Sequence, residues 1–212
     1  MKIICIGNAA YDVTLPVNHY PVENKKIRLD APRVECGGGS ASNCAYLLAK
    51  WGMETYFAGA VGDDYYGNRI IEEFEKVGVN TKYIEKKKDV PTTSSFIIAN
   101  TSIGSRTILT DKSKDMVMKK REIDDDFDVI LLDGYERDFA VEVIKKNPNA
   151  IKIIDAGSLR ENTVELAKMA YVSENDQPAV DALYDELVGY YNKLVLVALD
   201  SITVETAPNK VE

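Results

Sequence analysis

The sequence predicts an α/β fold, built on a doubly wound, mainly parallel sheet with a small β-lid. Two observations support this prediction. Short runs dense in Ile, Val and Leu alternate along the chain with segments of helical periodicity, and strands that helices cover on both faces have this composition. Two further segments, 13–36 and 91–110, interrupt the alternation. The chain of 212 residues is long enough to bury a sizeable core.

The positions of the runs predict the main elements. We predict strands at 2–7, 55–61, 127–133, 151–156 and 193–199. We predict helices at 41–51, 66–77, 139–146, 161–169 and 178–191. Because strand and helix alternate, the strands are expected to lie parallel in one sheet with helices on its two faces.

Apolar side chains in the first predicted helix recur at helical spacing. They are Cys44, Leu47, Leu48 and Trp51. This spacing places them on one helix face, which we expect to pack against the sheet. Gly52 follows at a position where helices commonly end.

The two interrupting segments predict the lid. Residues 13–36 are polar and punctuated by proline, whereas 91–110 contains two β-branched runs around a turn at 101–105, as in a hairpin. We expect the two segments to pair as a small β-lid over the main sheet. The predicted division is therefore a discontinuous core domain of 1–12, 37–90 and 111–212, and a lid of 13–36 and 91–110.

Charge and cysteine content narrow the class of protein. With 34 acidic and 26 basic residues the net charge is −8, which argues against nucleic acid or an anionic membrane as the main partner. No apolar run approaches the length of a membrane span. The three cysteines form no C-x-x-C pair, so a disulfide framework or a zinc site is not expected. A reducing, cytoplasmic location fits best.

The stretch GGGSASN at 37–43 is the strongest local feature. Glycine lets the backbone approach a ligand closely, and the N–H groups of a helix start bind anions or hydroxyls. The stretch is not a Walker A loop, because no Lys-Ser or Lys-Thr follows at the required spacing, and it lacks the G-x-G-x-x-G dinucleotide pattern. From these residues alone, a flexible strand-to-helix turn and a ligand cradle both remain open.

The surroundings of this stretch resemble a known family. GGSASN at 38–43, followed by a helix and by FAGAVGDDYYG at 57–67, resembles the N-terminal signature of the ribokinase-like (PfkB) carbohydrate kinases. GNAAYDVTL at 7–15 resembles the first strand of that family. DVPTTSSFIIAN at 89–100 and GSRTILTDKS at 104–113 are most similar to the ketohexokinase branch.

The resemblance implies a sugar kinase that uses ATP and Mg²⁺, with a sugar site at the carboxyl ends of the strands. Asp12 matches an aspartate that accepts hydrogen bonds from sugar hydroxyls. Gly38 and Gly39 match glycines that let the backbone approach the sugar, and Asn43 matches an asparagine that contacts it. Alternatives stay open for Asp12, as a polar strand end, and for Asn43, as a residue bonded to its own helix.

Four further residues are implied with open alternatives. Ser40 and Ser105 stand where the ketohexokinase branch carries asparagine, which puts a ketohexose substrate in doubt. Arg106 matches an arginine that faces the active site or a substrate phosphate, but is equally explained as an exposed turn residue. Glu136 matches a carboxylate near the sugar, with a structural role as the alternative.

The catalytic segment of the family has no counterpart here. In the family, a D-T-x-G-A-G-D segment supplies the anion hole and the aspartate base, but no G-A-G-D occurs in these 212 residues. We therefore assign no catalytic residue, and expect the C-terminal part of the family fold to be absent and this chain to be inactive. Truncation, a shortened gene product and completion by another chain are the three explanations. Glu174 and Asp176 lie where the family tunes magnesium, but the pattern differs and no metal ligand is assigned.

The sequence thus predicts a carbohydrate kinase whose partner is a small sugar. A nucleoside kinase of the same superfamily and a non-catalytic sugar-binding protein are the alternatives. By analogy with the family, a homodimer through the lid is also expected, whereas nucleic acid and membrane are not.

Overall fold

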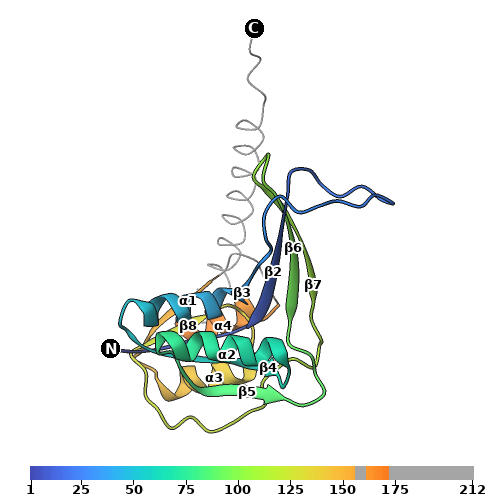
Figure 1. Cartoon of the computed structure of the whole chain (residues 1–212). Helices are drawn as coiled ribbons and strands as arrows, with labels where there is room; N and C mark the ends of the chain where they lie inside the picture. Colours follow the sequence, from blue (N-terminus) through green and yellow to red (C-terminus); the bar gives the residue numbers. More distant parts are fainter. Residues whose placement is uncertain (156–160, 172–212) are drawn as a thin grey trace. The chain divides into compact units, whose positions relative to one another are not determined.

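The computed structural model describes residues 1–155 and 161–171 (Figure 1). The predicted helix at 178–191 and the predicted strand at 193–199 lie outside the described residues. Among the described residues, no helix combines the length and the apolar composition needed to cross a bilayer.

The main sheet has five parallel strands in the order β5-β4-β1-β8-β9. They are β1 (Lys2–Ile6), β4 (Glu54–Gly62), β5 (Asn80–Lys87), β8 (Val129–Leu132) and β9 (Ile151–Ile154). Four of these strands confirm predicted ones. β5 was not predicted, because its sequence NTKYIEKK carries the charge and alternation of an edge strand rather than a continuous apolar run.

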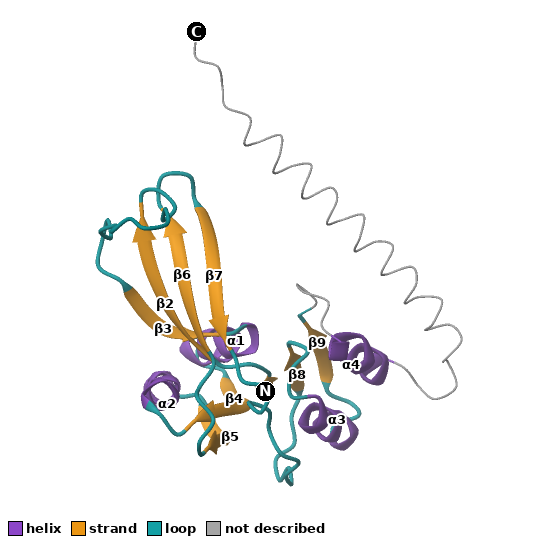
Figure 2. Cartoon of the chain, turned by 90° about the vertical axis from the view of Figure 1, so that its right-hand side faces the viewer, coloured by secondary structure: helices purple, strands orange, loops and turns teal. Residues whose placement is uncertain are grey.

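Helices cover both faces of this sheet, which confirms the doubly wound prediction (Figure 2). They are α1 (Ser40–Lys50), α2 (Tyr65–Val77), α3 (Arg137–Lys146) and α4 (Glu161–Tyr171). Alternate residues of β1 point to opposite faces, as strand geometry requires. Ile3 and Cys5 pack with α1 and α2, and Ile4 and Ile6 pack on the other face with α3 and α4.

The packing face predicted for α1 is right for Cys44 and Leu48, which are partly buried against the core, and wrong for Leu47 and Trp51. Its buried residues are small and include Ala41, Ala45 and Ala49, whereas Leu47 is 42% exposed and Trp51 is 66% exposed. A stripe of alanines lets the helix axis lie close to the sheet, and hydropathy alone selects the larger side chains instead. Gly52 ends the helix as predicted, with a positive φ of 85°.

The lid is a second sheet of four strands in the order β3-β2-β6-β7. They are β2 (Ala10–Val17), β3 (Val34–Gly38), β6 (Ser94–Asn100) and β7 (Ser105–Asp111). β6 and β7 form the predicted hairpin, and β2 pairs in parallel with β6, so the two interrupting segments lie side by side as expected. β2 runs through the predicted boundary between 12 and 13, and the division into two domains stays a prediction.

Asp64 links the start of helix α2 to Thr92, just before β6. Its carboxylate accepts hydrogen bonds from the N–H of Gly67 at 2.8 Å and from the N–H and hydroxyl of Thr92 at 2.7 and 2.6 Å. The Thr92 hydroxyl in turn accepts from the N–H of Gly62 at 2.8 Å. Burial opposes ionisation of Asp64, but these hydrogen bonds outweigh it and lower its pKa. The residues GDDYYG at 62–67 therefore connect the main sheet to the second sheet.

The alanine face of α1 can be tested by substitution. Replacing Ala45→Leu forces extra volume against the sheet and should lower the free energy of unfolding by about 1–3 kcal/mol. Replacing the exposed Trp51→Ala should change it by less than about 0.5 kcal/mol. Urea unfolding followed by circular dichroism measures both. A larger loss for Trp51→Ala would mean that α1 packs through the apolar stripe after all.

Candidate substrate-binding site

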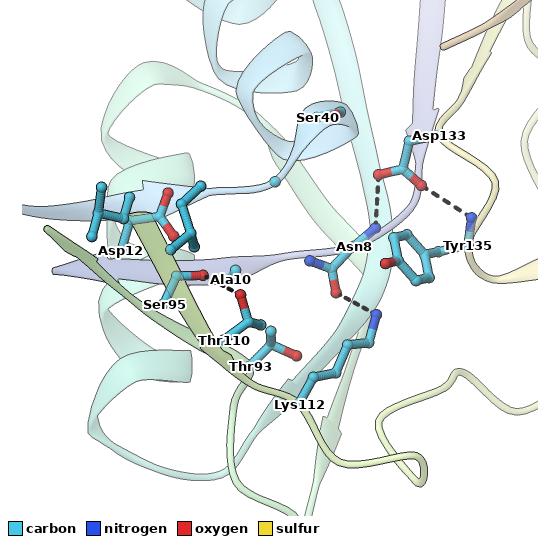
Figure 3. A pocket seen from close by; sticks show the side chains of 13 residues that line it. Asn8, Ala10, Asp12, Ser40, Thr93, Ser95, Thr110, Lys112, Asp133 and Tyr135 are labelled. Atoms are coloured by element: carbon cyan, nitrogen blue, oxygen red, sulfur yellow. Dashed lines mark hydrogen bonds between the residues drawn. The ribbon is translucent and has the colours of Figure 1, made fainter. Parts of the chain in front are cut away.

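A cavity of about 280 Å³ lies between the ends of β1 and β8 and one face of the second sheet (Figure 3). It is mainly polar. Its lining residues are Asn8, Ala10, Asp12, Gly39, Ser40, Thr93, Ser95, Ile97, Ile108, Thr110, Lys112, Asp133 and Tyr135.

The strand order explains why a cavity forms here. After β1 the chain builds β4 on one side of it and β8 on the other, so the winding direction reverses between β1 and β8. In open α/β sheets such a reversal leaves a crevice at the carboxyl ends of the strands, where ligands commonly bind. Asn8 follows β1 and Asp133 follows β8, so both lie at this crevice.

The carboxylate of Asp133 forms the floor of the cavity. It is fully buried and accepts hydrogen bonds from the N–H groups of Asn8 at 3.0 Å, Ala41 at 3.3 Å and Tyr135 at 3.1 Å. The Ala41 N–H belongs to the first turn of α1, where a negative charge is favoured. A side chain at Gly7 would collide with this carboxylate. Asp133 therefore fixes the positions of the strand ends and of α1 around the cavity.

Two glycines of the 37–43 stretch allow close approach within the protein. A Cβ at Gly38 would overlap the carboxylate of Asp12. Gly39 has a φ of 104°, which side chains rarely adopt, and a Cβ there would overlap the carbonyl oxygen of Asn8. Both positions require glycine, one to make room for Asp12 and the other to bring the start of α1 to the cavity.

Asp12 supplies a carboxylate to the cavity from β2. It is half-buried and lies in register with Ser95 on β6. Burial raises the pKa of this carboxyl, and a hydrogen bond from Ser95 and the positive charge of Arg106 partly offset the effect. The hydroxyls of Ser95 and Thr110 lie 3.5 Å apart beside it.

A lysine enters the cavity away from Asp12. Lys112 donates from Nζ to Oδ1 of Asn8 at 2.8 Å, and its Nζ lies 3.4 Å from the ring centroid of Tyr135 (Figure 3). Such a cation–π contact stabilises the ammonium group and holds its direction. The cavity therefore has the carboxylate of Asp12 on one side and, around Asn8 on the other, the ammonium group of Lys112 and the carboxylate of Asp133.

The structure brings only some of the sequence-derived candidates to the cavity. Asp12, Gly39 and Ser40 line it, and Gly38 lies directly behind Asp12. Asn43 is exposed on the first turn of α1, outside the lining. Their assignment as sugar contacts stays a prediction.

The remaining candidates lie elsewhere. Ser105 and Arg106 are exposed at the start of β7, although the charge of Arg106 reaches Asp12. Glu136 is buried, and its carboxylate accepts a hydrogen bond from the N–H of Met118 at 2.6 Å rather than lining the cavity. Its role as a sugar ligand also stays a prediction.

Sequence reasoning missed several lining residues. Asn8 follows the predicted strand 2–7 directly and Asp133 is the last residue of the predicted strand 127–133, so the strand ends could have indicated them. Thr93, Ser95 and Thr110 alternate along the predicted hairpin, and Lys112 continues that alternation. The hairpin register was needed to place them on one face.

The structure is that of an α/β protein with a cavity at the switch point of its sheet. The chain belongs to the PfkB family of carbohydrate kinases, whose family model matches residues 1–197. This match confirms the resemblance that the glycine signature indicated.

Relatives of known activity match only in part. The deoxyribokinase of Salmonella typhimurium is 33% identical over 129 residues, which are 58% of this chain and 40% of that protein. The ketohexokinase of Mus musculus is 28% identical over 108 residues, 51% of this chain and 36% of that protein. The chain spans less than half the length of these relatives.

A solved structure shares the fold. The ribokinase of Arabidopsis thaliana, determined in complex with ribose and ATP, matches with a TM-score of 0.63 at 20% identity. The match covers 88% of this chain and 69% of that one. The fold is therefore ribokinase-like, as predicted.

The buried carboxyl of Glu136 predicts a pH-dependent stability. Burial raises its pKa to about 7, above the ordinary value of 4.5. The protonated form therefore stabilises the fold: the effect is fully present below pH 4.5 and is lost as the pH rises through 7. Replacing Glu136→Gln removes this loss, so the stability of the variant relative to wild type should rise by about 2–3 kcal/mol between pH 5 and pH 8.

Urea unfolding at several pH values measures this difference. Glu142→Gln, at a partly exposed glutamate of α3, serves as the control for replacing a glutamate. If the profile of Glu136→Gln matched that of the control, burial would not raise the pKa of Glu136.

Proposed function

We propose that this protein is an ATP-dependent carbohydrate kinase, which transfers the γ-phosphate of ATP to a sugar hydroxyl. The observation that carries the proposal is the carboxylate of Asp12, held beside the hydroxyls of Ser95 and Thr110 in a cavity at the switch point of the sheet. Membership of the carbohydrate kinase family supports the same assignment.

The residues of the cavity have complementary tasks in this proposal. The carboxylate of Asp12 accepts hydrogen bonds from two sugar hydroxyls, and the hydroxyls of Ser40 and Ser95 donate or accept further ones. Ile97 and Ile108 contact the apolar C–H groups of the sugar. The second sheet acts as a lid that shields the sugar from water, which strengthens these hydrogen bonds.

ATP and Mg²⁺ are the cofactors that we propose. The structurally similar ribokinase binds ATP, which supports the nucleotide. Within residues 1–155 and 161–171, no group of three acidic, His or Cys side chains is arranged to hold a metal ion. Glu174 and Asp176 lie outside the described residues. We therefore assign no metal ligand and no catalytic base.

The two alternatives make different predictions for ligands. A nucleoside kinase would hold a ribose through Asp12, but a cavity of about 280 Å³ is at the small end of ligand sites and suits a monosaccharide better. A non-catalytic sugar-binding protein would bind sugar through the same residues and never turn over ATP. A panel of sugars and nucleosides, with and without ATP, separates the three.

A homodimer through the lid and a cytoplasmic location complete the proposal. Phe96 and Leu109 are cross-strand neighbours on β6 and β7, and both are exposed on the lid. Burying such a pair against a second copy would be favourable. The three cysteines are free, which is consistent with a reducing compartment.

The carboxylate of Asp12 provides the direct test. A monosaccharide that binds should raise the melting temperature of the chain, and Asp12→Asn should weaken its binding about 10- to 100-fold, because a charged hydrogen-bond acceptor is lost. Isothermal titration calorimetry measures both affinities.

Asp111→Asn is the matched control. Asp111 is exposed on β7 of the same sheet, and its strand neighbour Thr110 points into the cavity, so Asp111 points away. The control should bind sugar as the wild type does. Equal binding by Asp12→Asn and the wild type would remove Asp12 from the site, and no binding of any sugar would contradict the proposed function.

A further inference from the structure

One face of the β6–β7 hairpin forms a wall of the cavity, and the polarity of its side chains changes along the strands. The pairs Ile97–Ile108 and Ser95–Thr110 are cross-strand partners in the hairpin register. Thr93 and Lys112 stand one step further along both strands, beyond the last pair on this face, and both also line the cavity. The wall thus changes from apolar side chains near the turn to hydroxyls, and then to a hydroxyl beside an ammonium group.

Thr93 carries an unpaired polar atom. Its side chain is 1% exposed, and within the described part of the chain its Oγ1 is buried without a hydrogen-bond partner. An unpaired buried hydroxyl costs about 1–3 kcal/mol, so such groups are rare unless a ligand or water completes them. The backbone at this position is fixed, because the Thr93 carbonyl accepts a hydrogen bond from the N–H of Tyr11 at 2.9 Å. In Figure 3 the hydroxyl points toward the side of the cavity where Asn8 and Lys112 lie.

Lys112 is positioned beside this hydroxyl by two contacts. The oxygen of Asn8 accepts from its Nζ at 2.8 Å, and the ring of Tyr135 lies against the ammonium group. Three segments therefore hold the lysine: the end of β7, the loop after β1, and the loop after β8. A lysine held in this way presents a fixed positive charge to whatever occupies the cavity.

We propose that Thr93 and Lys112 form a subsite that binds the carboxylate of an acidic sugar, a polyhydroxy acid rather than a neutral sugar. The ammonium group can only donate hydrogen bonds and the Thr93 hydroxyl can donate one, so their natural partner is an anionic acceptor. Asp12, away from this subsite, accepts hydrogen bonds from hydroxyls. A ligand with hydroxyls at one end and a carboxylate at the other satisfies both sides of the cavity. The inference rests on the proposed sugar-binding function and names the substrate class of the same site.

Matched ligand pairs test the subsite by calorimetry on the 212-residue chain. D-gluconate is compared with D-glucitol, and D-glucuronate with D-glucose, because each pair differs only in the carboxylate. The better-binding acid should bind at least tenfold more tightly than its neutral partner. Lys112→Met should reduce this preference to less than threefold, because it weakens binding of the acid more than binding of the neutral sugar. Lys114→Met, at an exposed lysine two residues further on, should keep the full preference.

Thr93→Val is the second variant, because Lys112 also contacts Asn8 and its loss could disturb the fold. Valine has the shape of threonine without the hydroxyl. It should weaken binding of the acid about five- to tenfold and should keep or raise the melting temperature of the free protein, since an unpaired hydroxyl is removed. A lower melting temperature with unchanged affinity for the acid would show that Thr93 is purely structural and would overturn the subsite.

The outcomes separate this inference from the proposed function. If neutral sugars bind as tightly as the acids, the carboxylate subsite is wrong while the sugar site stands. Binding of D-glucose 6-phosphate that exceeds that of both acids and depends on Lys112 would assign the subsite to phosphate and contradict the carboxylate. If no sugar of either kind binds, the proposed function itself fails.

Discussion

The buried carboxylate of Asp133 is the interaction on which the site depends. It follows β8, receives the N–H group of Asn8 after β1, and receives an N–H group from the first turn of α1. A buried charge of this kind is tolerated only when its hydrogen bonds are satisfied, so the three elements must meet in one arrangement. Gly7 has no side chain because the carboxylate occupies that space. The cavity is the room that this arrangement leaves at the switch point of the sheet.

The second sheet is connected to the main sheet in the same region. β2 begins three residues after Gly7, and the carboxylate of Asp64 fixes Thr92 just before β6 begins. Asp12, Thr93 and Ser95 lie near these connections, and all three line the cavity. The turn of the β6–β7 hairpin lies at the other end of these strands, and Ser105 and Arg106 are exposed there. Polar groups with fixed positions therefore gather at the base of the lid.

The pattern of apolar runs and the glycine-rich family motif predicted different parts of this molecule. Continuous apolar runs identified β1, β4, β8 and β9, because burial on both faces leaves that composition, whereas the charged edge strand β5 carries no such signal. Hydropathy placed Cys44 and Leu48 of α1 on the packing face but missed its buried alanines, since close approach selects alanine. Matching the motif placed Asp12 in the cavity but said nothing of side-chain direction, and Glu136 turns to the backbone of Met118 instead. Thr93 and Lys112 required the hairpin register, which only the paired strands provide.

The parallel pairing of β2 with β6 also has a consequence for the order of folding. Tyr11 pairs with Ser94, and all of α1, β4 and α2 lies between them in the sequence. Contacts between residues so distant form slowly, because the loop that they close must first lose its conformational freedom. Helices and local strand–helix units form earlier. The cavity also needs the pairing of β1 with β8, which joins residues still further apart in the sequence, so we expect a ligand-binding cavity to form late in folding.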